Sequence, residues 1–146
     1  MITLPDGLFA TIHYTDEPED RQIALAEQDF YQYLKDCFFP TFGAVYAVWM
    51  EENEYISALR LEPYKDGFLL EALETAPKHR RKGYAVKLIR AVLAQMPDQR
   101  IYSHVSKRNV PSLAVHEKCG FRKISDSAIY IDGSVNHRAC TLCRDD

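Results

Sequence analysis

Apolar and polar residues alternate over several short stretches of the chain, a pattern that predicts β-strands. These strands are expected at residues 8–14, 44–50, 55–61, 68–75 and 101–105. The polar run at 51–54 predicts a hairpin turn between the second and third of them. The end of the chain predicts another hairpin, with arms at 122–131 and 137–142 and its turn at Asp132-Gly133.

Three other stretches carry apolar residues at a spacing of three or four, which predicts amphipathic helices. They cover residues 19–36, 83–94 and 109–118. The last has Asn109 in the N-cap position, Pro111 inside the first turn and Gly120 just behind the last turn. These residue types are typical of the two ends of a helix.

The strand–helix–strand unit from Phe68 to Val105 predicts two parallel strands, because such a unit closes through a right-handed crossover. The other connections predict antiparallel pairs. A chain of 146 residues builds one core, so residues 1–146 are expected to form a single domain. The fold class is therefore α/β in the broad sense and α+β in the narrower one, with a mixed, mostly antiparallel, twisted sheet.

The composition, with 47% apolar and 27% charged residues, is that of a globular protein. No stretch is long and apolar enough to span a membrane, and the first residues lack the basic start and apolar centre of a secretory signal. Four cysteines are too few for a disulfide framework and fit a reducing compartment. We therefore expect a cytoplasmic protein.

Charge is divided unequally along the chain. Residues 1–75 contain 15 acidic and 4 basic residues, whereas residues 76–146 contain 14 basic and 6 acidic ones. Between Lys78 and Arg108 the only acidic residue is Asp98. Such a basic stretch attracts an anion, which leaves open a nucleic acid, a membrane surface or a polyphosphate ligand.

The segment Arg80-Arg81-Lys82-Gly83-Tyr84-Ala85 lies where a predicted strand leads into a predicted helix. Unpaired backbone N–H groups and the helix dipole converge at such a junction, and small residues let an anionic oxygen approach the backbone. The sequence lacks the glycine patterns of nucleotide triphosphate loops and of dinucleotide-binding folds. A phosphate group is therefore the expected ligand.

Two segments resemble motifs of the GNAT superfamily of acetyl-CoA-dependent N-acetyltransferases. Residues 70–85 are similar to the strand and [QR]-x-x-G-x-[GA] loop of that family, and residues 109–121 are similar to its N-x-x-[AS]-x-x-x-[YH]-x-K-x-G-F segment. The resemblance implies a GNAT-like domain with about four helices and a central parallel strand pair that separates to hold acyl-CoA. It covers the chain from about Ala44 onward.

The resemblance also implies residues that bind acetyl-CoA. Backbone N–H groups of Arg81, Lys82, Gly83, Tyr84 and Ala85 would hold the pyrophosphate, with Arg80 at the [QR] position. The pantetheine arm would pair like an extra strand beside Leu73 and Thr75, and Asn109 would contact it or serve as the helix N-cap.

Catalytic groups are implied in the same way. His116 stands where family members often carry a tyrosine that protonates the leaving thiolate, with Tyr84 and Tyr102 as weaker substitutes.

The base that deprotonates the amine is expected to be Glu71, with Glu74 and His104 as alternatives. Glu71 and Glu74, three residues apart on a strand, should face opposite sides unless a bulge intervenes. A backbone N–H would stabilise the oxyanion.

His116, Cys119, Cys140 and Cys143 are soft metal ligands, but Cys140 and Cys143 are three residues apart on a predicted strand and should point to opposite faces. We therefore expect no metal cofactor.

The function implied is acetyl transfer from acetyl-CoA to a primary amine of a small molecule or peptide, by direct attack in a ternary complex. The acidic first half favours a cationic acceptor. Two alternatives stay open: a regulatory protein that binds acyl-CoA without turnover, and a nucleic-acid-binding module that uses the basic stretch. We expect neither a nucleic acid nor a membrane as partner, and a homodimer stays open.

Overall fold

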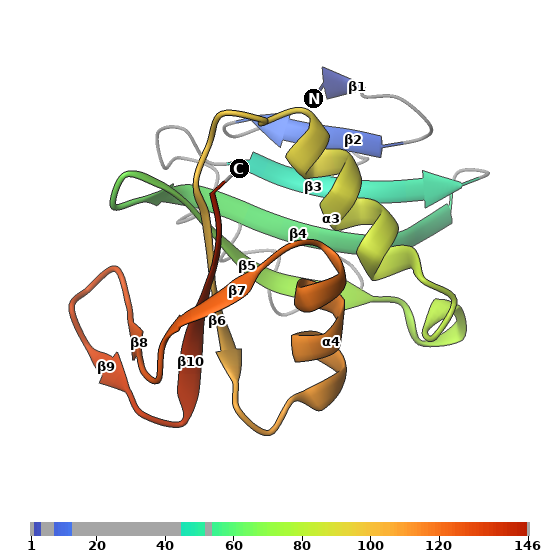
Figure 1. Ribbon diagram of the computed structural model, residues 1–146. Helices are drawn as coiled ribbons and strands as arrows, with labels where there is room; N and C mark the ends of the chain where they lie inside the picture. The colour runs from blue at the N-terminus through green and yellow to red at the C-terminus, as the bar shows by residue number, and fades with distance from the viewer. Residues whose placement is uncertain (1, 4–7, 13–44, 52–53, 146) are drawn as a thin grey trace.

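The computed structural model describes residues 2–3, 8–12, 45–51 and 54–145. Its main sheet has eight strands in the order β1-β2-β3-β4-β5-β6-β10-β7, and β8 and β9 form a separate two-stranded sheet (Figure 1). The strands are β1 (Ile2–Thr3), β2 (Leu8–Ile12), β3 (Val45–Glu51), β4 (Glu54–Tyr64), β5 (Gly67–Thr75), β6 (Ile101–Ser106), β7 (Arg122–Ser125), β8 (Ala128–Ile129), β9 (Val135–Asn136) and β10 (Ala139–Arg144).

Two α-helices and one short 3₁₀-helix lie in the described part of the chain: α3 (Tyr84–Ala94), α4 (Val110–Lys118) and η4 (Pro77–His79). They confirm the helices predicted at 83–94 and 109–118. The helix predicted at 19–36 lies outside the described residues, so the expected count of about four helices is not confirmed. Neither described helix has the length and apolar character that crossing a membrane requires.

The parallel strand pair is β5 with β6, as predicted from the crossover through α3. Every other neighbouring pair in the main sheet is antiparallel. β5 and β6 pair only over Phe68–Leu70 and Ile101–Ser103 before the strands separate. This separation divides the sheet beyond Leu70.

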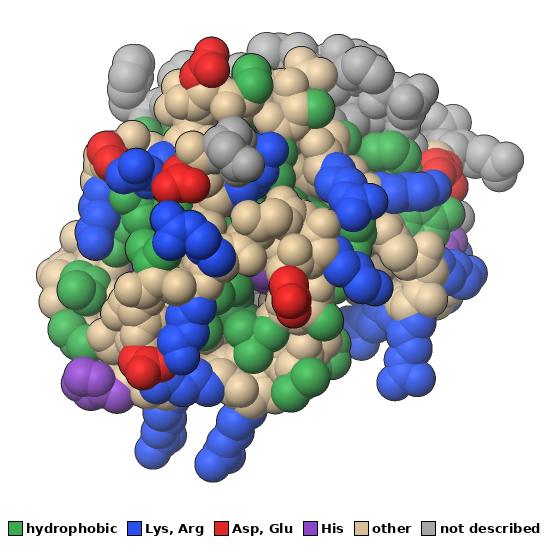
Figure 2. Space-filling view, viewed as in Figure 1, with side chains coloured by type: hydrophobic (Ala, Val, Ile, Leu, Met, Phe, Trp, Pro, Cys, Tyr) green, Lys and Arg blue, Asp and Glu red, His purple; other side chains and the backbone are tan. Residues whose placement is uncertain are grey.

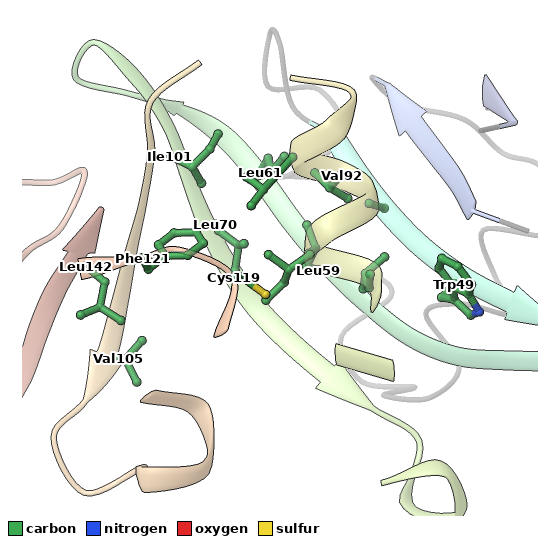
Figure 3. Close-up of a cluster of buried hydrophobic side chains, with 14 of the residues drawn as sticks. Trp49, Leu59, Leu61, Leu70, Val92, Ile101, Val105, Cys119, Phe121 and Leu142 are labelled. Carbon is green, nitrogen blue, oxygen red and sulfur yellow. The ribbon is translucent and has the colours of Figure 1, made fainter. Parts of the chain in front are cut away.

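The hydrophobic core lies between the sheet and α3 (Figure 3). Leu61, Leu70 and Ile101 of the sheet face Val92 of α3 there, and all four are buried. Burying one such side chain contributes about 2 kcal/mol. Residues of α4 pack against the same cluster, so both helices lie on one side of the sheet, which we call the helix face.

The other side of the sheet, which we call the far face, carries a second buried cluster. Its members are Tyr64, Leu69, Tyr102 and Cys143. Because side chains alternate along a strand, Leu69 and Leu70 point to different faces, as do Tyr102 and Ser103. Cys140 belongs to the helix-face cluster and Cys143 to the far-face cluster, which confirms that the two thiols diverge.

The predicted C-terminal hairpin is confirmed: β7 pairs antiparallel with β10, and β8 pairs antiparallel with β9. β10 inserts between β6 and β7 and pairs antiparallel with both. The Asp132-Gly133 turn joins β8 and β9, the end of this hairpin that forms the separate two-stranded sheet. All but the last residue of β10 are buried, so its backbone groups require a partner strand on each side.

Gly67 allows β5 to lie beside the residue that precedes β6. A Cβ atom at Gly67 would lie 1.9 Å from the backbone oxygen of Arg100, which accepts a hydrogen bond of 2.9 Å from the N–H of Phe68. Gly67→Ala must therefore push the two chain segments apart. We expect it to lower the free energy of unfolding, measured with urea, by about 3 kcal/mol.

Gly133→Ala is the control for this substitution. Gly133 has a positive φ of 86°, but a Cβ there would meet nothing within 4 Å. Only the backbone strain of about 1 kcal/mol should then be measured. An equal loss for the two variants would contradict the close approach at Gly67.

Candidate active site

The gap between β5 and β6 begins where a β-bulge bends β5. Arg60 of β4 pairs with Glu71, but Ala58 pairs with Glu74, so β5 holds one extra residue here. Ala72 has a positive φ of 53° and is exposed, which identifies it as the bulged residue. The bulge turns β5 away from β6 directly after their last paired residues, Leu70 and Ser103.

Three cavities lie in a row along this gap. The largest, of about 510 Å³, lies against the segment between β5 and α3. A second, of about 190 Å³, shares Leu73, Asn109 and Ser112 with the first. The third, of about 260 Å³, shares Glu71 and His104 with the second and is closed by Tyr130 and Asn136 of the β8–β9 region. Together they form a path from the helix face to the far face.

Glu71 lines the second and third cavities. Burial raises the pKa of its carboxyl group to about 7, and the nearby carboxylate of Glu62 adds to the rise while Arg60 opposes it. Burial also raises the pKa of Glu62, against the effect of Arg60. Glu71 can therefore exchange a proton near neutral pH.

A bulge does intervene between Glu71 and Glu74, so these residues do not face opposite sides. Their partners Arg60 and Ala58 are two residues apart on β4 and share a face, so Glu71 and Glu74 share it too. This is the far face, because Leu59 and Leu61, which alternate with Arg60, belong to the helix-face cluster.

His104, on the far face of β6, lines the same two cavities as Glu71. Its ring lies between those of Tyr64 and Tyr130, at centroid distances of 5.6 and 5.3 Å. Burial, followed by the charge of Lys65, lowers the pKa of His104. Its Nε2 atom is buried and has no hydrogen-bond partner in the described part of the chain.

His116 of α4 lines the second cavity from the helix face and is only 2% exposed. Its Nδ1 lies 2.7 Å from the backbone oxygen of Ser112, so Nδ1 carries the hydrogen and donates it. Its Nε2 lies 2.8 Å from Oγ of Ser103, whose hydroxyl donates to it when the ring is neutral. Burial lowers the pKa of His116, and the bond to Ser112 opposes that effect.

The ends of α4 fix the position of His116. Asn109 is the N-cap, as predicted, and its Oδ1 accepts a hydrogen bond of 3.2 Å from the N–H of Ser112. At the other end Gly120 has a φ of 88°, and the N–H of Phe121 donates to the oxygen of His116 at 3.0 Å. This is a Schellman motif. The Phe121 ring lies edge-on to the imidazole, at a centroid distance of 5.1 Å.

The loop before α3 lines the largest of these three cavities. Arg81 and Gly83 have positive φ values of 63° and 84°, and α3 begins without a side-chain cap. The first N–H groups of the helix therefore have no partner within it. Arg80 turns back to the end of β5, where its Nε donates to the oxygen of Thr75 at 3.0 Å.

The first residue of α3 is tied to the end of β3. The Tyr84 hydroxyl donates to Glu51 at 2.9 Å, and Nε1 of Trp49 donates to the same carboxylate at 3.2 Å. The bonds from Trp49 and Tyr84 lower the pKa of Glu51. The ammonium group of Lys87 lies 5.3 Å from the centre of the Tyr84 ring.

An anionic ligand fits this loop. No acidic residue stands in the first turn of α3, and a Cβ at Gly83 would meet nothing within 4 Å. Lys and Arg side chains are spread over this view of the molecule, including the right side, where the loop lies (Figure 2). The predicted ligand-binding residues that line the largest cavity are Leu73, Thr75, Arg80, Arg81, Gly83, Tyr84, Ala85 and Asn109.

Other predicted residues lie elsewhere. Lys82 is exposed and does not line the three cavities, and the Tyr102 hydroxyl donates to Asp66. The Tyr84 hydroxyl, the other predicted substitute for His116, donates to Glu51. Among the described residues no group of three or more His, Cys, Asp or Glu side chains could hold a metal ion.

The sequence analysis missed Ser103. Its small polar side chain stands between Ile101 and Val105 on the helix face of β6, at a position where the pattern predicts an apolar residue. This polar residue within an otherwise apolar face of the strand was the sequence signal that could have identified it. The environment of Glu71 was also missed, because Arg60 and Glu62 come from the neighbouring strand β4.

A sequence profile of the "Acetyltransferase (GNAT) family" matches residues 9–121 of this chain. The comparison of this chain with curated proteins found no match.

Three solved structures are similar in fold. An IAA acetyltransferase from Bacillus cereus has 18% identity and a TM-score of 0.63, with 95% of this chain and 99% of that chain covered. A GNAT family acetyltransferase from Elizabethkingia anophelis, solved with acetyl-CoA bound, has 17% identity and a TM-score of 0.64, with 97% and 99% covered. The ribosomal-protein-S18-alanine N-acetyltransferase from Escherichia coli has 13% identity and a TM-score of 0.63, with 93% and 92% covered. Because the family profile spans most of the chain, this protein belongs to the GNAT acetyltransferase family.

Proposed function

We propose that this protein transfers the acetyl group of acetyl-CoA to a primary amine of a small molecule or peptide, by direct attack of the amine. The observation that carries the proposal is the gap through the sheet. Glu71 borders it on the far face, and His116 with Ser103 borders it on the helix face. Two reactants that enter from opposite faces can meet there.

Acetyl-CoA would supply an activated acyl group as a thioester. The loop from Arg81 to Ala85 would bind its pyrophosphate through backbone N–H groups, because these are oriented toward the largest cavity and lie at the positive end of the α3 dipole. Arg80, Lys82 and Lys87 add positive charge around the loop. The structure from Elizabethkingia anophelis, which contains acetyl-CoA, supports this ligand.

Beyond Leu70 one edge of β5 no longer pairs with β6. Its backbone groups are therefore available to an extended ligand, in the way that an exposed strand edge accepts another strand. The pantetheine arm would pair beside Leu73 and Thr75, with Asn109 on the opposite wall. A backbone N–H of this edge would stabilise the oxyanion that forms at the acetyl carbonyl.

Glu71 would act as the base. A primary ammonium group has a pKa of about 10, so a proton must leave the nitrogen before it attacks. A carboxylate with a pKa of about 7 accepts that proton far better than an ordinary glutamate. Glu62 and Glu74 stand on the same far face as Glu71 and would add attraction for a cationic acceptor.

Gly83→Glu tests the placement of the pyrophosphate. A carboxylate at this position brings bulk and negative charge to the loop, and we expect it to weaken acetyl-CoA binding by about 100-fold or more. Calorimetric titration of acetyl-CoA into the two proteins measures the change. A short DNA duplex, titrated in parallel, tests the alternative ligand of the basic stretch.

Gly133→Glu is the matched control. Gly133 has a φ of 86°, close to the 84° of Gly83, and a Cβ there also meets open space. Backbone strain and added charge are thus the same in both variants, and only the site differs. Unchanged acetyl-CoA affinity in Gly83→Glu would contradict the placement, and DNA binding without acetyl-CoA binding would contradict the proposed function.

Glu71→Gln tests the base. The ionised form of Glu71 must accept the proton, and its pKa is about 7, so activity of the wild-type protein should fall as the pH is lowered through this value. The variant should lose about 100-fold in kcat and should lose this pH dependence as well. Thiol release from acetyl-CoA with a panel of amines, followed from about pH 5.5 to about pH 9, measures both kcat and its pH dependence on either side of the pKa of about 7.

Glu117→Gln removes an exposed carboxylate of α4 and should leave the profile unchanged. A wild-type profile in Glu71→Gln would assign the base elsewhere. Glu74→Gln and His104→Asn would then identify it, since these residues share the far face with Glu71.

A further inference from the structure

The hydrogen bonds of His116 leave neither of its ring nitrogens free to reach the gap. Nδ1 is held by the backbone oxygen of Ser112 at 2.7 Å, and Nε2 is held by Oγ of Ser103 at 2.8 Å. The ring is 2% exposed, and Phe121 covers it edge-on. The shorter contact of His116 to a hydroxyl that lines the cavity is from Nε2 to Ser103, since Ser112 Oγ lies 3.4 Å from Nδ1, whose hydrogen the Ser112 carbonyl oxygen accepts.

Ser103 stands at the start of the gap. It is the last residue of β6 that pairs with β5, and it lines the same cavity as Glu71 and His116. Its neighbours Tyr102 and His104 point to the far face, so Ser103 approaches the gap from the helix face, the side of the proposed acetyl-CoA site. The base and the serine thus border the reacting carbon from different sides.

We infer that Ser103 is a catalytic residue that donates a proton to the leaving sulfur, and that His116 is a positioning residue that supplies Ser103 with that proton. The inference rests on the proposed function. As the carbon–sulfur bond of the thioester breaks, the sulfur keeps the electron pair and takes the hydrogen of Ser103 Oγ. In the same step His116, protonated on both ring nitrogens, passes its Nε2 hydrogen to Ser103 Oγ and becomes neutral, and it regains a proton from solvent between turnovers. An ammonium acceptor first gives one proton through Glu71 to solvent. The nitrogen gives a second proton to Glu71 as the amide forms, and the sulfur receives one proton through Ser103.

Both charge states of His116 fit its surroundings. In the neutral ring Nδ1–H donates to Ser112, and Nε2 accepts from the Ser103 hydroxyl. In the charged ring Nε2–H donates to Ser103 Oγ, and the serine hydroxyl is released to donate into the cavity. The switch requires only rotation of the hydroxyl hydrogen, since no heavy atom has to move.

Ser103→Ala separates this relay from direct donation by His116. In the relay the variant has no hydroxyl to protonate the sulfur, so kcat should fall about 100-fold with little change in KM for acetyl-CoA. If His116 donated directly, removing Ser103 would open Nε2 to the gap, and kcat would be kept or would rise. That result would overturn the inference.

Other variants exclude a merely structural role. Ser103→Thr keeps the hydroxyl and should restore most of the lost kcat. Ser103→Ala, His116→Phe and the double variant should show nearly the same kcat, because each interrupts one relay. A fold loss in kcat of the double variant equal to the product of the two single losses would show that the residues act separately, which would contradict the inference. Ser125→Ala, a serine of β7 outside the three cavities, is the control and should behave as wild type. Thermal unfolding of each variant checks that it is folded.

A measurement without turnover uses the complex of the protein with CoA, which carries a thiol in place of the acetyl thioester. A hydroxyl that donates to sulfur stabilises the thiolate, so Ser103→Ala should raise the pH at which the bound thiol ionises. Ultraviolet absorbance of the thiolate, titrated against pH, measures that shift. An unchanged titration in Ser103→Ala would contradict the inference. Failure of the wild-type protein to bind CoA would contradict the proposed function instead.

Discussion

The separation of β5 from β6 is the constraint on which the rest of the site depends. A continuous sheet would bury Glu71 and His116 on opposite sides of a closed layer, and no molecule could reach both. Because the two strands stop pairing after Leu70 and Ser103, the layer opens where these residues stand. The bulge at Ala72 causes the separation, although a positive φ at a non-glycine residue costs about 1 kcal/mol. Such strain is typical of functional sites.

Burial affects the titrating groups on the two faces in opposite directions. It raises the pKa of Glu71 and lowers that of His116, because in each case the charged form loses solvent. Glu71, with a pKa of about 7, nevertheless keeps a large ionised fraction near neutral pH. The proposed proton transfer on the helix face therefore depends on the hydrogen-bond partners of His116 as well as on its own pKa, since Ser112 and Ser103 hold the two ring nitrogens.

Local patterns predicted most of the fold. The strands from β3 to β6 and the helices α3 and α4 each carry their own periodicity, and residues such as Asn109 and Gly120 mark helix ends through backbone chemistry. Pairing between distant segments was not predictable in the same way. β10 separates β7 from β6 because of burial on both of its faces, and the bulged position is occupied by Ala72 rather than a glycine. The relative orientation of Glu71 and Glu74 depends on that bulge.

The same distinction separates the two parts of the site. The loop proposed to bind the pyrophosphate would use backbone groups, and a backbone conformation leaves a mark in the sequence, here the positive φ that Gly83 adopts without strain. Proton transfer works through side chains that meet only after folding. Ser103 and His116 are 13 residues apart and on different elements, so nothing local connects them. In the proposed mechanism a buried histidine stands where a tyrosine was expected, and the hydroxyl of Ser103 carries its proton to the sulfur.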